Sequence, residues 1–561
     1  MLLDYDFTKY PWIILNSRQL CDFEMITNGA YAPLKGFMTK HQYNSCLKDM
    51  TIDGKMLFPI PITLSINLKT KEELKHSSFL TLKHITGLPL GILKVESIFE
   101  YDLQKEASSC IGCYDLNHPY TKIQYKEVQE GYTYYIGGDI VYFKQVPHYD
   151  FIEYRLSPEE TKNFIKRNGW KKIIGFQTRN PMHRSHYELT KYALKQAGNG
   201  NSAKLLLTPC VGITQDCDID YFTRVKCYIE LLKYYDINTV KLNLINFGMR
   251  MYGPRSALFH AIIRKNYGCT HFVVGRDHAS PSFKKENGED FFAVYDAQAL
   301  LLQYADRIGI KPIVSKMIVY AVPKLKPNTL GSYELVDEVD TEQYDIKQIS
   351  GTQQRYILQN GHDLPDWFTF PLIKKQLQKY FLPPRNQGFC VYFYGLSGSG
   401  KSYISHFLKS KLQEITDRVI TLLDGDIIRT HISKGLGFSK LDRSINVRRI
   451  GYVASEIVKH GGICLVSNIA PYQEDRKHNK ELIEIYGNYI EVLVDTNLSV
   501  CEERDCKGLY KLAREGVIEE FTGISDPFEK HLQEDLAIDG TCSLEENLDK
   551  LLLLLRSRSL L

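Results

Sequence analysis

Two histidines stand three residues apart in the segment 177–186, whose sequence is QTRNPMHRSH. This spacing would place His183 and His186 on one face of a helix. We expect that helix to begin with Asn180 as its N-cap and Pro181 as its first residue, because asparagine and proline favour those positions. Free N–H groups and the helix dipole favour phosphate at a helix N-terminus, and the two arginines of the segment add donors for a charged transition state. The segment is therefore a candidate site of phosphate chemistry, with a pair of structural histidines under a helix cap as the alternative.

A glycine-rich pattern, GLSGSGKS, occupies residues 395–402 and is called the P-loop below. It has the form G-x-x-x-x-G-K-[ST] and lies between an apolar segment at 389–394, expected to be a strand, and a helical segment at 402–408. Its glycines would let backbone N–H groups wrap the phosphates of a nucleotide, while Lys401 bridges the β- and γ-phosphates and Ser402 reaches Mg²⁺. The alternative, a glycine turn without function, is disfavoured by the strand and helix around it. Two nucleotide sites in one chain imply two chemical steps, or one step and a sensor.

The elements that must position these residues follow from the pattern of apolar and turn-forming residues. Residues 1–165 carry short apolar runs with frequent Pro and Gly, which is typical of a small β-rich structure. From residue 171 strands and helices alternate, with buried strands expected at 171–176, 203–209 and 270–275, as in a doubly wound α/β fold. The stretch 323–388 is more polar and rich in turns. We predict four regions: 1–168, 169–322, 323–387 and 388–561.

Length and composition restrict the function classes. The chain has 561 residues, too many for one hydrophobic core, so three or four domains are expected. Its 70 Lys and Arg against 66 Asp and Glu give a net charge of +4, which does not indicate nucleic-acid binding through a general basic field. No apolar stretch is long enough to cross a membrane, and we expect no signal peptide. The 13 cysteines form no regular framework and indicate reduced thiols in a cytoplasmic protein.

Longer segments around the first site resemble ATP sulfurylase, over residues 1 to about 380. The resemblance rests on PLKGFM at 33–38, YDAQ at 295–298 and ISGT at 349–352, and on an almost continuous match from 249 to 281. It implies adenylyl transfer, in which sulfate attacks the α-phosphate of MgATP to give adenosine 5′-phosphosulfate (APS) and pyrophosphate. Positioning and charge neutralisation are most of what such a transfer requires, so no covalent intermediate is needed.

The same resemblance implies roles for individual residues. Those that would hold sulfate are Gln177, Arg179 and Ala279. Those assigned to catalysis, as the turn and as the stabilisers of the phosphates, are Thr178, Arg179, Asn180, His183 and His186. Those that would bind ATP are Gln177, Thr178, Arg179, Asn180, Gly275, Arg276, Asp277, His278 and Ile318. Two positions depart from the family pattern: Ser256 stands where an acidic residue is usual, and Ser280 replaces a glycine, so turn geometry could differ there.

The C-terminal region, from about 388 to 540, resembles APS kinase. The resemblance is carried by segments in the family's order: LDGD at 423–426, the match from 437 to 451, IAPY at 469–472, the match from 504 to 510, and FTGI at 521–524. It implies transfer of the γ-phosphate of ATP to the 3′-hydroxyl of APS, giving 3′-phosphoadenosine 5′-phosphosulfate (PAPS) and ADP. Some family members have a phosphorylated serine where this chain has Ala470, but in-line transfer from ATP does not need it.

This second resemblance also implies roles. The ATP-binding residues are those of the P-loop: Gly395, Leu396, Ser397, Gly398, Ser399, Gly400, Lys401 and Ser402. The residues on the APS side, which hold the phosphosulfate or sandwich the adenine (Phe438 and Phe521), are Arg429, Phe438, Arg443, Asn446, Arg449, Ile469, Lys507 and Phe521. Lys401 is assigned to catalysis, Ser402 to Mg²⁺, and either Asp424 or Asp426 would orient or deprotonate the 3′-hydroxyl.

Together the resemblances imply an α/β multidomain protein. Its parts would be a β-rich PUA-like N-terminal domain at 1–168, a Rossmann-like adenylyltransferase domain at 169–322, a small sulfurylase subdomain with a linker at 323–387, and a P-loop APS kinase domain at 388–561. We expect ATP, sulfate and APS as ligands, Mg²⁺ with ATP, and a homo-oligomer, with neither nucleic acid nor membrane as a partner.

Two functions fit this order of domains. The first is a bifunctional enzyme that converts sulfate to APS and then to PAPS. The second is an ATP sulfurylase whose C-terminal domain is a non-catalytic PAPS-binding regulatory module, as in fungal enzymes that carry such a domain with a degraded P-loop. The intact Lys401 and Ser402, with both aspartates of the DGD segment, favour catalysis. A third reading, an unrelated adenylyltransferase joined to a nucleoside kinase, fits the short motifs but not the longer segments.

Overall fold

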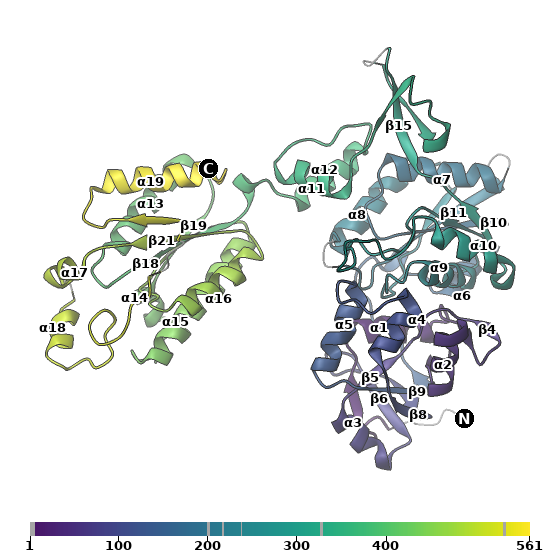
Figure 1. Ribbon diagram of the computed structural model, residues 1–561, viewed down its shortest axis with the longest axis horizontal. Coiled ribbons are helices and arrows are strands. Elements are labelled where there is room, and N and C mark those ends of the chain that lie inside the picture. Colours follow the sequence, from purple (N-terminus) through teal and green to yellow (C-terminus); the bar gives the residue numbers. More distant parts are fainter. Residues whose placement is uncertain are drawn as a thin grey trace. The chain divides into compact units, whose positions relative to one another are not determined.

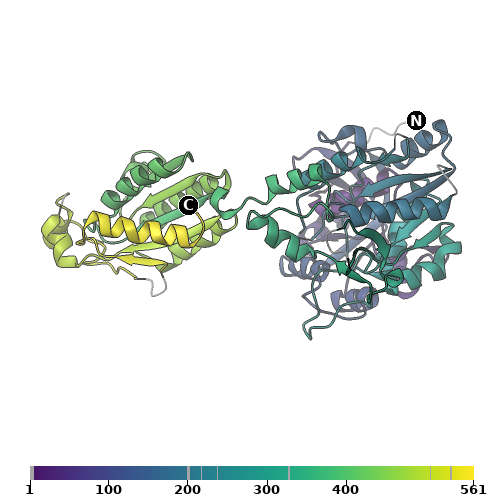
Figure 2. The ribbon, with the colours of Figure 1, turned by 90° about the horizontal axis from the view of Figure 1, so that it is seen from above.

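The computed structural model describes residues 6–198, 202–215, 218–236, 238–325, 329–505, 507–530 and 534–561. The chain forms two compact units: the first is Met1–Ser350 with Leu364–Leu377, and the second is Gly351–Asp363 with Gln378–Leu561. Figures 1 and 2 show both units as layers of helices around β-sheets. Within the described residues, no helix is long and apolar enough to cross a membrane.

The N-terminal part of the first unit is built on a seven-stranded, largely antiparallel sheet. Its order is β1-β6-β7-β9-β2, and β5 and β8 also pair with β9. The strands are β1 (Trp12–Ile14), β2 (Gly36–Phe37), β5 (Leu64–Ile66), β6 (Phe79–Lys83), β7 (Pro89–Lys94), β8 (Ser97–Glu100) and β9 (Tyr134–Phe143). The hairpin β3 (Thr51–Ile52) and β4 (Met56–Leu57) and the helices α1 (Ser17–Thr27), α2 (Lys40–Asp49), α3 (Leu68–Glu73), α4 (Leu103–Ile111) and α5 (Pro119–Gln129) complete it. The predicted β-rich N-terminal domain is confirmed.

A five-stranded parallel sheet follows, in the order β12-β11-β10-β13-β14. Its strands are β10 (Lys172–Thr178), β11 (Ala203–Pro209), β12 (Val240–Leu242), β13 (His271–Val274) and β14 (Lys311–Val314). The helices of this part are α6 (Pro158–Arg167), α7 (Arg184–Ala197), α8 (Tyr221–Leu232), α9 (Pro254–Asn266) and α10 (Asp296–Ile308). The strand order reverses between β10 and β13, which confirms the doubly wound α/β prediction.

The segment after this sheet contains three antiparallel strands, β15 (Ile318–Pro323), β16 (Ser332–Leu335) and β17 (Tyr344–Lys347), with β15 in the middle. The helices α11 (Gly351–Gln359) and α12 (Pro371–Tyr380) come next.

The second unit is built around another five-stranded parallel sheet, in the order β19-β20-β18-β21-β22. The strands are β18 (Phe389–Tyr394), β19 (Ile420–Asp424), β20 (Ile463–Ser467), β21 (Asn488–Val494) and β22 (Leu536–Ile538). The helices are α13 (Lys401–Ile415), α14 (Gly425–Thr430), α15 (Lys440–Lys459), α16 (Gln473–Glu484), α17 (Leu498–Arg504), α18 (Leu509–Arg514) and α19 (Leu544–Ser557). The predicted P-loop kinase fold is confirmed.

Helices cover both faces of this sheet, and the alternation of side chains along β18 produces two separate cores. Phe389, Val391 and Phe393 pack with α13 and α19 on one face. The intervening Cys390 and Tyr392 pack with α15 and α16 on the other. Figure 1 shows the same arrangement, with α13 and α19 on one side of the sheet and α15 and α16 on the other.

Candidate active sites

The first site lies at the carboxyl ends of the adjacent parallel strands β10 and β13. A sheet of this kind binds its ligand where the strand order reverses, which is between these two strands. Gln177 and Thr178 end β10, and the turn 275–279 follows β13. Ile318, the other residue assigned to ATP, begins β15 in the three-stranded sheet.

The turn after β10 is held by hydrogen bonds to its carbonyl groups. The Thr178 hydroxyl donates to the Asn180 carbonyl over 3.0 Å and accepts from the Asn180 amide over 3.2 Å. From α8, the Tyr228 hydroxyl donates to the same carbonyl over 2.8 Å, and Arg224 donates to the Arg179 carbonyl over 2.8 Å. The backbone of the predicted catalytic turn is therefore held in place by the Thr178 hydroxyl and by two side chains of α8.

The predicted helix start at Asn180 and Pro181 is wrong. α7 begins at Arg184, and its N-cap is His183. A helix starting at Pro181 would need the Arg184 amide to bond the Asn180 carbonyl, but that amide donates to the distant Phe368 carbonyl over 3.1 Å. The Asn180 carbonyl is already taken by the turn and by α8, so tertiary contacts override the local preference.

The two predicted histidines lie together at this helix N-terminus, with ring centroids 6.1 Å apart. His183 stacks on Phe368 at 4.2 Å, and its Nδ1 lies 3.0 Å from the Thr369 hydroxyl. His186 Nδ1 accepts from the His183 amide over 3.2 Å, and burial lowers the pKa of His186 to about 4. A neutral ring whose Nδ1 accepts carries its proton on Nε2, so His186 offers a neutral N–H donor to the site.

Arg179 is the cation among the three residues predicted to hold sulfate. Its guanidinium donates to the Ser282 hydroxyl over 3.2 Å and to Met251 Sδ over 3.1 Å, and it lies 3.7 Å from an Asp218 carboxylate oxygen. These contacts orient the side chain toward the segment that follows Ala279.

The other two residues assigned to sulfate are tied to the same region. The Gln177 side-chain oxygen accepts from Arg264, and its Nε2 lies 3.7 Å from Met249 Sδ. Ala279 has φ +59°, and its carbonyl accepts from the Gly253 amide over 3.2 Å. The segment 249–253 therefore contacts all three predicted sulfate residues and holds them in one region.

The predicted nucleotide turn runs from Gly275 to His278. Asp277 has φ +52°, and its carboxylate pairs with the exposed Arg276 at 3.0 Å. His278 Nε2 lies 3.1 Å from His260 Nδ1, and burial lowers the pKa of His278 to about 3. The buried pair is therefore neutral and fixes the end of the turn.

The two residues that depart from the family pattern, Ser256 and Ser280, both form hydrogen bonds within turns. Ser256 is buried, and its hydroxyl accepts from the Tyr252 amide over 2.9 Å. The Ser280 amide donates to the Asp277 carbonyl over 3.1 Å. Neither serine removes a group from the site.

In the second unit the P-loop connects β18 to α13. Gly398 and Gly400 have φ +73° and +105°, a backbone conformation that favours glycine. Lys401 is buried at the start of α13, where its ammonium donates to the Leu396 carbonyl over 2.6 Å and the Ser399 hydroxyl over 3.3 Å. Burial lowers the pKa of Lys401 to about 8. The ammonium thus already points into the loop that would receive phosphate.

The two aspartates left open by the sequence differ in their surroundings. Asp424 is buried at the end of β19, where it accepts from the Ser402 hydroxyl over 2.7 Å and from the Asp426 amide over 3.0 Å. The Ser467 hydroxyl, from the neighbouring β20, lies 3.2 Å from that of Ser402. Asp426 is exposed, and its carboxylate pairs with Lys507. Both Ser402 and Asp424 offer hard oxygen atoms of the kind that bind Mg²⁺.

The predicted adenine-binding aromatics lie on two segments that bond each other. Phe438 is 66% exposed, with the Arg429 guanidinium 4.6 Å from its ring centroid. Phe521 is buried. The Lys440 amide donates to the Glu520 carboxylate over 2.9 Å, which joins the segment after Phe438 to the one before Phe521.

Arg443 is buried and already has a carboxylate partner. Its guanidinium lies 3.0 Å from Asp526 and donates to the Tyr472 hydroxyl over 2.7 Å, and this hydroxyl donates to Asp526 over 2.8 Å. Asn446, one turn later on α15, is buried, and its side-chain oxygen has no hydrogen-bond partner among the described residues.

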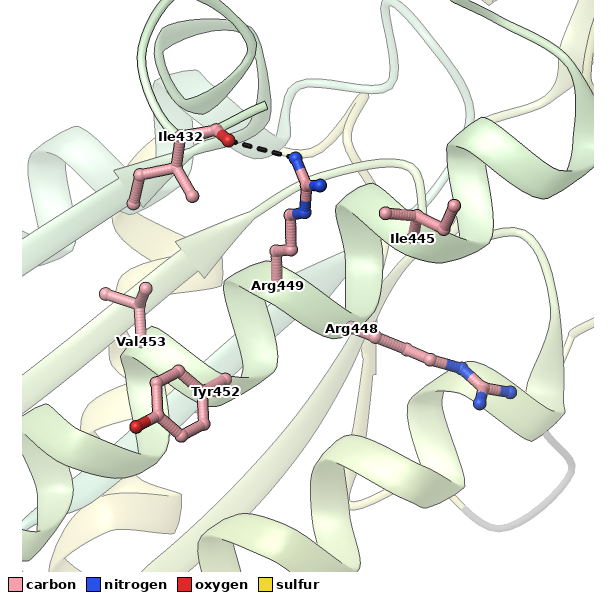
Figure 3. Close-up of a pocket in the computed structure, with 6 residues that line it drawn as sticks. All are labelled: Ile432, Ile445, Arg448, Arg449, Tyr452 and Val453. Atoms are coloured by element: carbon pink, nitrogen blue, oxygen red, sulfur yellow. Dashed lines mark hydrogen bonds between the residues drawn. The ribbon is translucent and has the colours of Figure 1, made fainter. Parts of the chain in front are cut away.

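The remaining two predicted residues are placed differently. Arg449 lies on the exposed side of α15, away from the buried face that carries Arg443, and donates to the Ile432 carbonyl over 3.0 Å (Figure 3). The Ile469 carbonyl accepts from the Gly395 amide over 3.4 Å, which places Ile469 beside the P-loop. Ile432 lies between Arg429 and Phe438 in the chain, so Arg449 also contacts the segment that joins two of the predicted residues.

Sequence reasoning missed the residues that hold these side chains in place. Arg224 and Tyr228 on α8 support the catalytic turn, and Arg264 on α9 binds Gln177. A signal was visible for Arg224 and Tyr228, which lie among buried apolar residues of α8, but not for Arg264, whose helix face also carries the polar Ser256 and His260.

Comparisons with known proteins agree with this geometry. Three family models match the chain: PUA-like domain at residues 4–145, ATP-sulfurylase at 152–380 and Adenylylsulphate kinase at 387–539. The sulfate adenylyltransferase of Chaetomium globosum is 39% identical over 555 residues, covering 98% of this chain and 94% of the relative. That of Neurospora crassa is 39% identical over 563 residues, covering 100% and 96%.

A solved structure also matches almost the whole chain. It is the hexameric APS kinase from Thiobacillus denitrificans, with a TM-score of 0.77, 28% identity, and coverage of 99% of this chain and 94% of the other. Both resemblances seen in the sequence are thereby confirmed.

Proposed function

The chain belongs to the ATP sulfurylase family and carries an adenylylsulphate kinase domain, and from this premise we propose that it makes PAPS from sulfate in two steps. Each unit carries one step. The relatives are named for the first activity alone, so the kinase activity is the part of the proposal that needs its own support.

In the first step a sulfate oxygen attacks the α-phosphorus of ATP, and pyrophosphate leaves. Gln177, Arg179 and the Ala279 backbone would hold the sulfate, which is consistent with their common contact with residues 249–253. His183 and His186 would donate hydrogen bonds to the phosphates. Because the ring of His186 is neutral, the charge that forms on pyrophosphate would be balanced by Arg179 and by the positive end of the α7 dipole.

In the second step the 3′-hydroxyl of APS attacks the γ-phosphorus of ATP, and ADP leaves. We assign the hydroxyl proton to Asp426, because both oxygens of Asp424 are engaged by Ser402 and the Asp426 amide. Lys507, the partner of Asp426, would move to the phosphosulfate. Arg449 would be a further cation for the phosphosulfate.

Magnesium would enter with ATP. Ser402 and Asp424 fit the ion, since their oxygen atoms already lie together beside the P-loop. When bound, the ion would neutralise charge on the β- and γ-phosphates. We also propose a homo-oligomer, on the basis of the hexameric protein that matches the whole chain.

The observation that carries the kinase proposal is the complete P-loop apparatus. Lys401 points into the loop, and Ser402 is bonded to Asp424. A regulatory domain that only binds PAPS would need the cationic residues on the APS side, but it would not need Lys401 or the bonded pair of Ser402 and Asp424.

The test is an incubation of the purified protein with MgATP, labelled sulfate and pyrophosphatase, with APS and PAPS separated over time. Label that reaches PAPS without added kinase supports both steps. Label that stops at APS favours the regulatory module, and PAPS would then be expected to inhibit APS formation. No label in either product contradicts the proposal as a whole.

A further inference from the structure

Arg264 is a fully buried arginine at the back of the first site. It lies on α9, and its side chain crosses the carboxyl ends of β10 and β11. Its Nε donates to the Thr208 hydroxyl over 3.1 Å, one terminal nitrogen donates to the Thr208 carbonyl over 2.9 Å, and the same nitrogen donates to the side-chain oxygen of Gln177. Gln177 and Thr208 face each other in the register of these two strands, so the guanidinium joins both.

This guanidinium has no carboxylate to balance it. Among the residues that the structure describes, Arg264 forms no ion pair, and its other terminal nitrogen has no hydrogen-bond partner. The buried Arg250 and Arg476, in contrast, lie 2.6 and 3.0 Å from the carboxylates of Asp22 and Glu491. An unpaired buried charge is costly, and burial lowers the pKa of Arg264 to about 10. An anion that binds from solution would balance this buried charge.

The backbone makes room for this side chain. A β-carbon at Gly175 on β10 would lie 2.9 Å from Cγ of Arg264, so an alanine there would displace the stem. The positive charge also reaches the nucleotide turn, because after burial the charges of Arg264 and Arg179 lower the pKa of His278 further. The positive charge near the nucleotide turn therefore comes from these two arginines and not from His278 or His260, whose pKa values are lowered.

We propose that Arg264 is a positioning residue for the sulfate of the first step. We also propose that its charge makes the sulfate site favour a dianion over a monoanion. It fixes the Gln177 carboxamide with the oxygen turned toward the guanidinium, so that Nε2 is presented to the oxyanion as a donor. Its unbalanced charge is compensated when a doubly charged tetrahedral anion binds in front of Gln177. This inference rests on the proposed function and deepens it, since it names the group that selects the charge of the substrate.

The test compares three variants. Arg264→Met removes the charge. Arg264→Lys keeps the charge but cannot bind Gln177 and Thr208 at the same time, as the guanidinium does. Lys265→Met is the control, because it removes a charge from the exposed side of the same helix. Pyrophosphate release is measured at varied sulfate and at varied ATP. Inhibition by thiosulfate, a tetrahedral dianion, is compared with inhibition by perchlorate, a tetrahedral monoanion.

For Arg264→Met we expect the KM for sulfate to rise about tenfold or more, the scale of losing a charge-assisted interaction, while the KM for ATP changes less than about twofold. The preference for thiosulfate over perchlorate should fall. Arg264→Lys should keep that preference but raise the KM for sulfate, because Gln177 loses its fixed orientation. Lys265→Met should behave like the wild-type protein.

Equal rises in both KM values, or an unchanged anion preference in Arg264→Met, would overturn the inference. If Arg264→Met does not fold, the test rests on Arg264→Lys. A KM for sulfate equal to that of the wild-type protein in the folded lysine variant would also overturn the inference. If the wild-type protein releases no pyrophosphate, the proposed function fails, but the inference is still decided by binding. In that case sulfate, with a non-hydrolysable ATP analogue, must raise the melting temperature of the wild-type protein more than that of Arg264→Lys.

Discussion

Lys401 is the residue that separates the two proposed steps. Its ammonium donates to the P-loop of the second unit, so Lys401→Ala is expected to leave APS formation measurable and to abolish PAPS formation. The measurement is the labelled-sulfate incubation, with Lys411→Ala, an exposed lysine on the same helix, as the control. Loss of both products in a folded Lys401→Ala protein would contradict independent sites.

The lowered pKa of Lys401 also predicts how the kinase step depends on pH. Its free-state pKa is about 8, and bound phosphate favours the ammonium form, so the pKa rises when ATP binds. The KM for ATP should be nearly constant below pH 8 and should rise by about tenfold per pH unit above it. The assay is PAPS formation from supplied APS, which isolates this site. A flat profile to about pH 10 would show that Lys401 stays charged in the free protein.

His183 is the corresponding residue of the first site. His183→Ala is expected to lower the rate of APS formation by about a hundredfold or more, the scale of losing one transition-state donor. Conversion of supplied APS to PAPS should not change, which controls for folding of the second unit. A near-normal rate of APS formation would instead assign His183 a structural role, through its stacking on Phe368 and its bond to Thr369.

Among the elements, the turn after β10 depends on α8. Tyr228→Phe removes the hydroxyl that donates to the Asn180 carbonyl, and we expect the kcat of APS formation to fall by about tenfold because the turn is less well fixed. The free energy of unfolding of the first unit should fall by only about 1 kcal/mol. Kinetics and urea titration of the same variant separate these effects. A loss of stability with unchanged kcat would mean that the turn does not need this support.

Sequence predicted the strands better than the helix start. Residues 203–209 and 389–394 form strands with the predicted bounds, because short, mainly apolar runs between turn residues become buried strands. The start of α7 was missed because it depends on the Phe368 carbonyl, far away in the chain. The site residues could be named because they stand in local motifs. The contact of Arg264 with Gln177 could not, because the two residues are 87 positions apart in the chain.

At the scale of the whole molecule, the first unit should be the acid-sensitive one. Burial lowers the pKa of the histidines His118, His186, His260, His271 and His278, all of which lie in that unit. The unfolded chain takes up protons near pH 6.5, but the folded unit does not. Stability therefore falls as the pH drops through 6.5, until the folded histidines titrate at about 4 and below. Each of His118, His186, His260 and His278 contributes up to about 1.4 kcal/mol per pH unit, and the more exposed His271 contributes less.

Tryptophan fluorescence can report this loss selectively. The three tryptophans, Trp12, Trp170 and Trp367, all belong to the first unit. Urea titrations followed by their fluorescence should give midpoints that fall steadily between pH 7 and pH 5. A constant midpoint over that range would mean that the buried histidines accept protons without unfolding.

The two cores on the faces of the β18 sheet have a consequence for inheritance. They are assembled from the strands and from helices such as α13, α15, α16 and α19, and neither includes a residue of the P-loop. A single base change that replaced Lys401 is therefore expected to leave both cores intact, and with them α15, which carries the proposed APS-side residues Arg443 and Asn446. If these residues bind a sulfated nucleotide as proposed, one such change turns an enzyme domain into a receptor for the product that it no longer makes.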